Sequence, residues 1–337
     1  MASSDLPRAS GYLPGTDRHE IWWEEHGSAD GIPLVYLHGG PGGSLGAGGW
    51  KNKMDPARFR TIGLDQRGCG RSRPSAASAD HDLASNTTAA LIEDLEALRR
   101  HLGVERWVLN GVSWGSTLAL AYAQAHPDRV LGVVLMAVTT TSRREVDWIT
   151  EGVGAIFPEA WDALATAVER EDPTYRRGRD RIVEACAALL RGADDAARLR
   201  VARAWDAWES AHISLDAPRT ALGPTSGAAP SATGPAEDTA RLLAFATLVT
   251  HYWAHDGFLD PPLLERMAAL EGIPATLVHG RRDVSGPVQT AWEVHRAWPG
   301  SELIVVEDEG HGGPSMVEHW SHANDRLADR LTAETST

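Results

Sequence analysis

Residues 111–115 read Gly-Val-Ser-Trp-Gly, with a glycine two positions before and two positions after a serine. This spacing is typical of a sharp strand-to-helix turn that exposes a serine hydroxyl for nucleophilic attack. The motif alone is a weak signal. Here, however, an apolar segment comes directly before it and an alanine-rich segment directly after it, which is the setting the motif requires. The sequence therefore predicts Ser113 as a nucleophile, with a plain strand–helix turn as the alternative.

A nucleophilic serine needs hydrogen-bond donors for the negative charge that develops on the attacked carbonyl oxygen. One donor is usually the backbone N–H of the residue after the nucleophile, here Trp114. The segment 38–42, His-Gly-Gly-Pro-Gly, follows an apolar run and offers the second donor, which we expect at Gly40. Neither a Gly-Lys-Ser/Thr nor a G-x-G-x-x-G pattern accompanies this segment, so binding of nucleotide phosphates is not expected.

Asp283 and His311 are the expected partners of the serine. In enzymes with this motif the acid follows the serine and the histidine comes last. Asp283 follows the apolar run 275–280 and His311 follows the run 302–306, and open parallel sheets place their sites just beyond the carboxyl ends of strands. His311 would take the serine proton, and Asp283 would orient the imidazole. Asp308 is the alternative for the acid.

The elements that must position these residues alternate between strand and helix. Short apolar runs predict strands at 32–37, 59–64, 107–109, 130–138, 275–280 and 302–306. Leucines at helical spacing after the caps 86–88 predict a helix that ends before Gly103, and the alanine-rich segment 116–124 predicts another. Strands that are apolar on both faces and alternate with helices indicate an α/β fold with a mostly parallel sheet.

The pattern changes between residues 139 and 260. Helical periodicity dominates there and tryptophan is frequent, whereas the segment 217–235 is rich in Pro, Gly, Ala, Ser and Thr and is expected to be a loop. We therefore expect a core domain built from residues 1–138 and 261–337, with a helical cap domain inserted at 139–260.

Composition limits the classes of partner. The 337 residues carry a net charge of −14, which argues against a nucleic-acid partner because phosphates demand a basic face. The N-terminal segment has no apolar run of a secretory signal, and no stretch has the length of a membrane span. We expect a cytoplasmic protein with no membrane partner. The sequence does not indicate an oligomeric state.

Neither cysteines nor paired histidines indicate a metal site. Cys69 and Cys186 are the only cysteines, and neither has the spacing of a metal-binding or disulfide motif. Cys69, in a glycine-rich turn, is expected to fill space rather than to react. His251 and His255 are four apart on a predicted helix and could hold a metal, but no acidic motif accompanies them. We expect packing or pocket lining there, no metal and no cofactor.

Several segments taken together resemble the proline iminopeptidases (prolyl aminopeptidases), serine peptidases of the α/β-hydrolase superfamily. The resemblance covers nearly the whole chain. It rests on the segment 38–42, on Asp-Gln-Arg-Gly-Cys-Gly-Arg-Ser at 65–72 and on the serine motif with its helix at 111–120. Shorter matches lie in the cap, at 157–161, 208–209, 251–252 and 257–259. The resemblance implies an α/β-hydrolase fold and removal of an N-terminal proline without a cofactor.

The resemblance also implies how substrate is held. In such enzymes cap glutamates bind the free amine of the substrate and aromatic residues enclose its pyrrolidine ring. Glu209 matches one such glutamate. The expected substrate-binding residues are Glu209, Trp208, Val249, His251 and Tyr252.

Val249 departs from the family pattern. It stands where the family has an acidic residue, so one amine-binding charge is absent. This leaves three hypotheses for function. The first is an aminopeptidase for N-terminal proline or another small residue, acting on peptides or amides. The second is an esterase or amidase with the same triad and an uncharged or specialised substrate. The third is a binding protein without catalysis.

Overall fold

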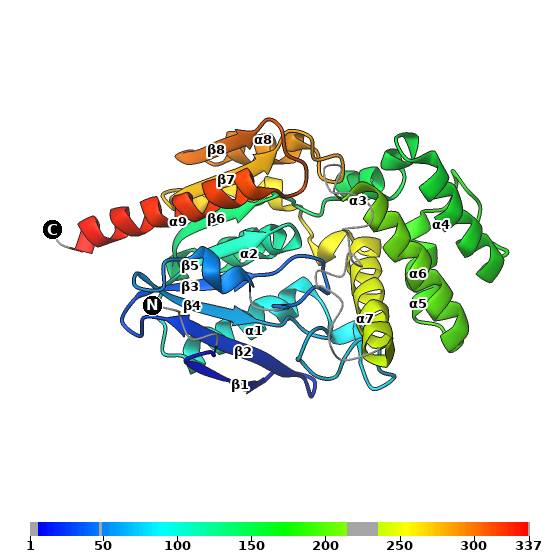
Figure 1. Ribbon diagram of the computed structural model, residues 1–337, viewed down its shortest axis with the longest axis horizontal. Helices are drawn as coiled ribbons and strands as arrows, with labels where there is room; N and C mark the ends of the chain where they lie inside the picture. Colours follow the sequence, from blue (N-terminus) through cyan, green and yellow to red (C-terminus); the bar gives the residue numbers. More distant parts are fainter. Residues whose placement is uncertain (1–5, 47–48, 214–234, 336–337) are drawn as a thin grey trace.

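An eight-stranded sheet forms the core of the computed structural model, which describes residues 6–46, 49–213 and 235–335 (Figure 1). Its strands are β1 (Ala9–Pro14), β2 (Glu20–Gly27), β3 (Ile32–Leu37), β4 (Phe59–Leu64), β5 (Trp107–Val112), β6 (Val130–Met136), β7 (Ala275–Gly280) and β8 (Ser301–Val306). Their order in the sheet is β1-β2-β4-β3-β5-β6-β7-β8. β1 and β2 pair antiparallel, and so do β2 and β4, whereas the other neighbouring strands are parallel.

Helices cover both faces of this sheet. The α-helices are α1 (Thr88–His101), α2 (Trp114–Ala125), α3 (Arg143–Thr150), α4 (Pro158–Glu171), α5 (Ile182–Leu190), α6 (Asp195–His212), α7 (Pro235–Ala254), α8 (Val288–Ala297) and α9 (Pro314–Thr335). Successive side chains of a strand point to opposite faces, so β5 sends Leu109 into the cluster with α1, α2 and α8 and Val108 into the cluster with α9. This double burial explains the continuous apolar runs in the sequence.

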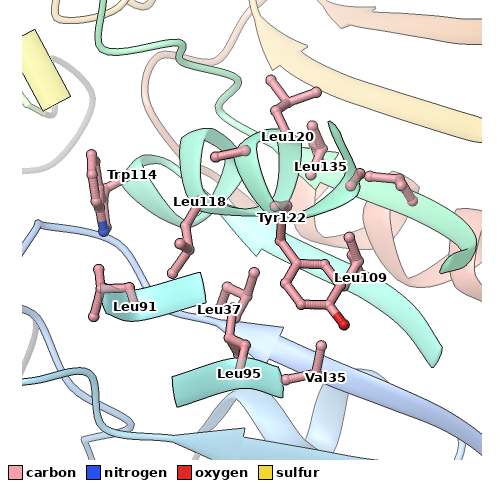
Figure 2. Close-up of a cluster of buried hydrophobic side chains, with 14 of the residues drawn as sticks. Val35, Leu37, Leu91, Leu95, Leu109, Trp114, Leu118, Leu120, Tyr122 and Leu135 are labelled. Carbon is pink, nitrogen blue, oxygen red and sulfur yellow. The ribbon is translucent and has the colours of Figure 1, made fainter. Parts of the chain in front are cut away.

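The serine motif joins the sheet to helix α2. Figure 2 shows Leu118 and Tyr122 of α2 packed over Leu37 and Leu109 of the strands beneath, with leucines of α1 alongside. Leu37, Leu109, Leu118 and Tyr122 are completely buried. Because interiors are packed like organic crystals, such a contact fixes where the helix begins. The apolar pattern thus positions the start of α2 and the residue before it.

β2 is a strand that the apolar pattern does not reveal. Its sequence holds Glu24 and Glu25, and both side chains are buried. Each is compensated, Glu24 by Arg71 at 2.8 Å and Glu25 by Arg60 at 2.8 Å and by Arg8. Buried charges are tolerated only when paired, and these pairs break the apolar run that marks the other strands.

Helices α3 to α7 lie between β6 and β7 in the chain. Figure 1 shows α4, α5 and α6, in green, at one end of the molecule, opposite the C-terminal end of α9. They have an apolar cluster of their own, which includes Trp205 and Trp208 of α6.

Helix α7 connects the two clusters. Ala244, Leu248 and Tyr252, spaced four residues apart, join the cluster of the sheet, whereas Phe245 and Val249, one position further along, join the cluster of the cap. Positions four apart share one helix face. α7 therefore has two apolar faces, one for each cluster.

The predicted α/β-hydrolase fold is confirmed, and the strands that were predicted, β3 to β8, end within three residues of the expected positions. β1 and β2 were not predicted. The loop expected at 217–235 lies outside the described residues apart from Pro235, where α7 begins. The helices of the described segments include none with the length and hydropathy that a bilayer crossing demands.

Candidate active site

Ser113 sits at the turn between β5 and α2 with a strained backbone. Its φ of 55° and ψ of −125° lie where a residue with a side chain is seldom found. The glycines beside it allow this turn. A Cβ on Gly111 would lie 2.3 Å from the carbonyl oxygen of Gly115, and a Cβ on Gly115 would lie 2.0 Å from that of Leu37. The motif is therefore a steric requirement, and its strain marks a candidate functional position.

His311 and Asp283 lie beside this serine. Nε2 of His311 is 3.0 Å from Oγ of Ser113, and Nδ1 of His311 is 2.7 Å from Oδ2 of Asp283. Since the carboxylate can only accept, Nδ1 carries a proton and Nε2 can accept the serine proton. The structure thus brings together three side chains from turns that are far apart in the sequence.

Asp283 is buried and held on both oxygens. Its Oδ1 accepts the backbone N–H groups of Ser285 at 3.0 Å and Gly286 at 2.9 Å. Burial acts to raise its pKa, but the charge and hydrogen bond of His311, with His279 and Gly286 adding to them, hold the pKa below the ordinary value. The carboxylate is therefore ionised and fixed in orientation.

The pKa of His311 is shifted in the opposite direction to that of Asp283. Burial disfavours the charged imidazolium, but the charge and hydrogen bond of Asp283, together with the charge of Glu209, outweigh it and raise the pKa of His311 above its usual 6.5. A base whose pKa is close to the working pH transfers protons efficiently.

His279 belongs to the scaffold beneath. Its Nδ1 accepts the N–H of Val138 at 3.0 Å, so the proton is on Nε2, which donates to the carbonyl of Gly286 at 2.7 Å. This links the segment after β6 to the loop that carries Asp283.

Gly40 and Trp114 both line the cavity in front of Ser113. Trp114 is the first residue of α2, where a helix leaves its N–H groups without partners of its own. Gly40 has a φ of +123°, which side chains rarely adopt. Below them Gln66 accepts the indole N–H of Trp114 at 2.9 Å and donates to the carbonyl of His38 at 3.0 Å. Gln66 therefore ties the glycine loop to the start of α2.

A cavity of about 260 Å³ opens in front of these groups. The sheet side contributes Ser113, His311 and the glycine loop, whereas α3, α6 and α7 contribute the opposite wall. That wall is largely apolar, with side chains of Val146, Ile149, Ile213, Phe245 and Trp253. A small cavity with an apolar wall and polar groups at defined positions suits a small ligand.

Glu209 supplies a carboxylate to this wall. It is 3% exposed, and its Oε1 accepts the indole N–H of Trp205 at 2.6 Å. Within the described part of the chain this is its one hydrogen bond, so Oε2 is left for a ligand. Burial raises the pKa of Glu209 to about 8, despite the opposing effects of Trp205 and of the charge on His311. An ammonium group placed here would restore the ionised form.

Glu145 also borders the cavity, but its carboxylate is already engaged. It accepts the N–H of Thr140 at 3.1 Å and the N–H and hydroxyl of Ser142 at 3.1 and 2.9 Å. The bond from the N–H of Ser142 is one half of the capping box of α3. Glu209 is therefore the better candidate for binding a ligand.

The structure places the other cap candidates outside the cavity lining. Val249 and Trp208 are buried in the apolar cluster of the cap. His251 contacts the carbonyl of Asn86 through Nε2 at 3.0 Å, and Tyr252 donates to the side chain of Asn86 at 2.5 Å. Their role in substrate binding stays a prediction.

Asp308 and Cys69 take no part in the group of Ser113, His311 and Asp283. Asp308 is exposed, and it is Asp283 that contacts His311. Cys69 is buried, and burial with the nearby charge of Asp65 raises its pKa. Over the described ranges, no three histidine, cysteine or acidic side chains are grouped as a metal site would need.

His212 and Ser285 are cavity-lining residues that sequence reasoning did not find. Nδ1 of His212 is 2.8 Å from Oγ of Ser285, which in turn donates to the carbonyl of His212 at 3.0 Å. A signal for His212 existed, since it is three residues after Glu209 and so on the same helix face. The sequence contains no comparable signal for Ser285, because its hydrogen-bond partner is 73 residues away.

Comparisons with known proteins show the family of the chain. The profile of the alpha/beta hydrolase fold matches residues 32–314. A probable proline iminopeptidase of Streptomyces coelicolor is 42% identical over 97% of this chain and 98% of its own length. The proline iminopeptidase of Neisseria gonorrhoeae is 39% identical over 96% of this chain and 98% of its own.

Solved structures show the same fold at lower identity. A proline iminopeptidase from Mycobacterium smegmatis superposes with a TM-score of 0.62 at 17% identity, covering 96% of this chain and 100% of that one. An esterase from Rhodococcus superposes with a TM-score of 0.59 at 20% identity, covering 95% of this chain and 98% of that one.

Proposed function

The chain belongs to the proline iminopeptidase family of α/β hydrolases, and from this premise we propose that it removes N-terminal proline, or another small residue, from short peptides and amides. The catalytic groups are Ser113, His311 and Asp283, and Glu209 binds the free amine of the substrate.

One observation supports this proposal most directly. The cavity in front of Ser113 contains a buried carboxylate, that of Glu209, with one oxygen left for a ligand. A buried carboxylate pairs strongly with an ammonium group. Because an N-terminal residue carries such a group close to its carbonyl, this pairing presents the first peptide bond to the serine, which is exopeptidase chemistry.

The reaction follows from the positions of the groups. Oγ of Ser113 attacks the proline carbonyl as His311 removes its proton, and the backbone N–H groups of Gly40 and Trp114 stabilise the oxyanion. His311 then protonates the departing amine, leaving prolyl-Ser113. A water, deprotonated by His311, attacks this ester and releases proline, and the proton returns to Ser113.

The cavity limits the substrate. At about 260 Å³ it suits one small residue whose apolar ring meets Phe245 and Trp253. The leaving chain must point away from the cap wall. We expect the substrates to be short cytoplasmic peptides.

The test compares L-prolyl-4-nitroanilide with its N-acetyl derivative and with 4-nitrophenyl acetate. We expect acetylation to lower kcat/KM by at least about 100-fold, since it removes the charge that pairs with Glu209. Equal turnover of the free and acetylated substrates would contradict the proposal. Ester hydrolysis without prolyl amide hydrolysis would instead select the esterase hypothesis.

A further inference from the structure

Among the described residues, one ring nitrogen of His212, at the end of α6, has a hydrogen-bond partner and the other has none. The residue is 1% exposed, and its Nδ1 lies 2.8 Å from Oγ of Ser285. Its Nε2 is buried and has no hydrogen-bond partner among the residues that the structure describes. A buried polar atom without a partner costs stability and calls for an explanation such as a ligand.

The partners of Ser285 determine where the proton of His212 lies. The hydroxyl of Ser285 donates its hydrogen to the carbonyl of His212 at 3.0 Å, so its oxygen must accept from the imidazole. Nδ1 therefore carries the proton, and Nε2 is left as an acceptor. Burial, with the charge of His311 adding to it, lowers the pKa of His212 to about 3, so the ring stays neutral and Nε2 keeps its lone pair.

His212 lies on the wall of the cavity that faces Ser113, as does Glu209. They are three positions apart on α6, so both side chains lie on one face of the helix. Both also interact electrostatically with His311. Glu209 and His212 thus belong to one short stretch of the cavity wall.

The proposed substrate needs two acceptors. The ring nitrogen of an N-terminal proline is a secondary amine, and when protonated it carries two N–H groups. Glu209 has one oxygen free to accept. Val249 carries no polar group on its side chain and packs in the apolar cluster of the cap. A second acceptor elsewhere on the wall would let each N–H group have a partner of its own.

We propose that Nε2 of His212 accepts the second N–H of the substrate's terminal ammonium, beside Glu209, and so helps to select substrates with a free amine. This inference rests on the proposed function and names a residue that determines specificity. Ser285 is the positioning residue, because it holds the imidazole in the tautomer that accepts.

The test distinguishes the roles of the two ring nitrogens of His212. In His212→Asn the side-chain amide can still donate to Ser285 from the position of Nδ1, but the acceptor at the position of Nε2 is lost. In His212→Gln an oxygen can occupy the position of Nε2. Two rates are measured for each variant: kcat/KM for L-prolyl-4-nitroanilide, and labelling of Ser113 by a fluorophosphonate, which has no amine.

We expect His212→Asn to lower kcat/KM for the prolyl substrate by about 10-fold, the usual effect of one hydrogen bond to a charged group, while labelling changes by less than twofold. His212→Gln should retain at least a third of the prolyl activity. A role limited to holding the loop of Asp283 would slow both reactions together.

His295 provides a matched control. Its Nδ1 lies 2.8 Å from Oγ of Ser301, the same arrangement as in His212 and Ser285, but it does not line the cavity. His295→Asn should leave both rates unchanged. If His212→Asn lowers neither rate or lowers both equally, with its melting temperature unchanged, the role of His212 is wrong and the proposed function stands. If the wild-type protein is labelled but does not cleave the prolyl substrate, both are wrong.

Discussion

The sheet and the cap contribute to the candidate site in different ways. The sheet supplies Ser113, His311 and Asp283 from turns that directly follow β5, β8 and β7. The cap supplies Glu209 and His212 from the last turn of one long helix, together with apolar wall residues. The sheet thus contributes the groups proposed to react, and the cap contributes the groups proposed to choose the substrate.

The difference lies in what fixes each side chain. Where the sheet meets α2, backbone contacts exclude any side chain at certain positions. At Gly115, for example, a Cβ would collide with the carbonyl of Leu37. In the cap, side chains are placed by the packing of helix faces, which tolerates substitution more readily. The sheet, which carries the groups proposed to react, should therefore tolerate few substitutions near the site. The cap, which carries the groups proposed to bind the substrate, can tolerate more.

The largest effect is expected at Ser113. Ser113→Ala removes the nucleophile and should lower kcat by at least about 10⁴-fold. Because the hydroxyl contributes no packing in the core, the melting temperature should change by no more than about 2 °C. Turnover of the prolyl substrate and thermal unfolding measure the two effects. Residual activity above one per cent of wild type would place the reaction elsewhere.

Two glycine substitutions, one beside the sheet and one in the cap, compare these regions directly. Gly115→Ala should lower kcat/KM by at least about 100-fold, because the new Cβ must displace the backbone of the elbow and so misplace Ser113. Gly178, in the cap, has a φ of +70° and open space around it. Gly178→Ala should cost about 1 kcal/mol of unfolding free energy and leave activity unchanged. Similar activity in the two variants would contradict the comparison.

Glu209→Gln should lower kcat/KM for L-prolyl-4-nitroanilide by about 10- to 100-fold, mainly through a higher KM, since the charge that holds the amine is lost. Hydrolysis of 4-nitrophenyl acetate should change by less than threefold. Glu184 is an exposed glutamate of the cap paired with Arg181, and Glu184→Gln is the matched control, expected to match wild type on both substrates. An unchanged KM in Glu209→Gln would remove Glu209 from the site.

The pH dependence should be governed by the sheet rather than by the cap. The pKa of His311 is raised above 6.5, and the base works only when neutral. Hydrolysis of 4-nitrophenyl acetate should therefore fall about tenfold per pH unit on the acid side of a midpoint above 6.5. Glu209→Gln should lower this midpoint only slightly, because Asp283 contributes more to the shift. A midpoint below 6 in the wild-type protein would contradict this account.

The smallest catalytic effect is expected at Val249. This side chain is fully buried in the apolar cluster of the cap, so Val249→Ala should cost about 2 kcal/mol of unfolding free energy, between the costs of smaller and larger truncations. KM for the prolyl substrate should stay within twofold of wild type. Denaturant unfolding and steady-state kinetics test both parts. A large change in KM without a loss of stability would show that Val249 contacts the substrate.

The sequence predicted the fold well where local rules apply. Apolar runs located the parallel strands, because strands buried on both faces have few polar positions. The turns that hold Ser113, Asp283 and His311 follow those runs, so their meeting at one edge of the sheet could be expected.

Other features needed the three-dimensional structure. β2 was not found because Glu24 and Glu25 are buried as ion pairs, and no local pattern shows their partners. Val249 packs into the cluster of the cap because its face of α7 meets that cluster and not the cluster of the sheet. The sequence of α7 alone does not show this. The pairing of His212 with Ser285 joins residues 73 apart, and neither has a motif. Specificity in the cap is thus set by tertiary packing.

Labelling by a fluorophosphonate tests the central claim most directly, because the reagent needs the nucleophile and its base but no amine site. The rate and position of labelling are measured by peptide mass spectrometry in the wild-type protein, His311→Ala and Glu209→Gln. The account predicts modification at Ser113 alone, at least about 10³-fold slower in His311→Ala and within twofold of wild type in Glu209→Gln. Labelling at another residue, or an equal loss in both variants, would contradict the separation of reaction from recognition.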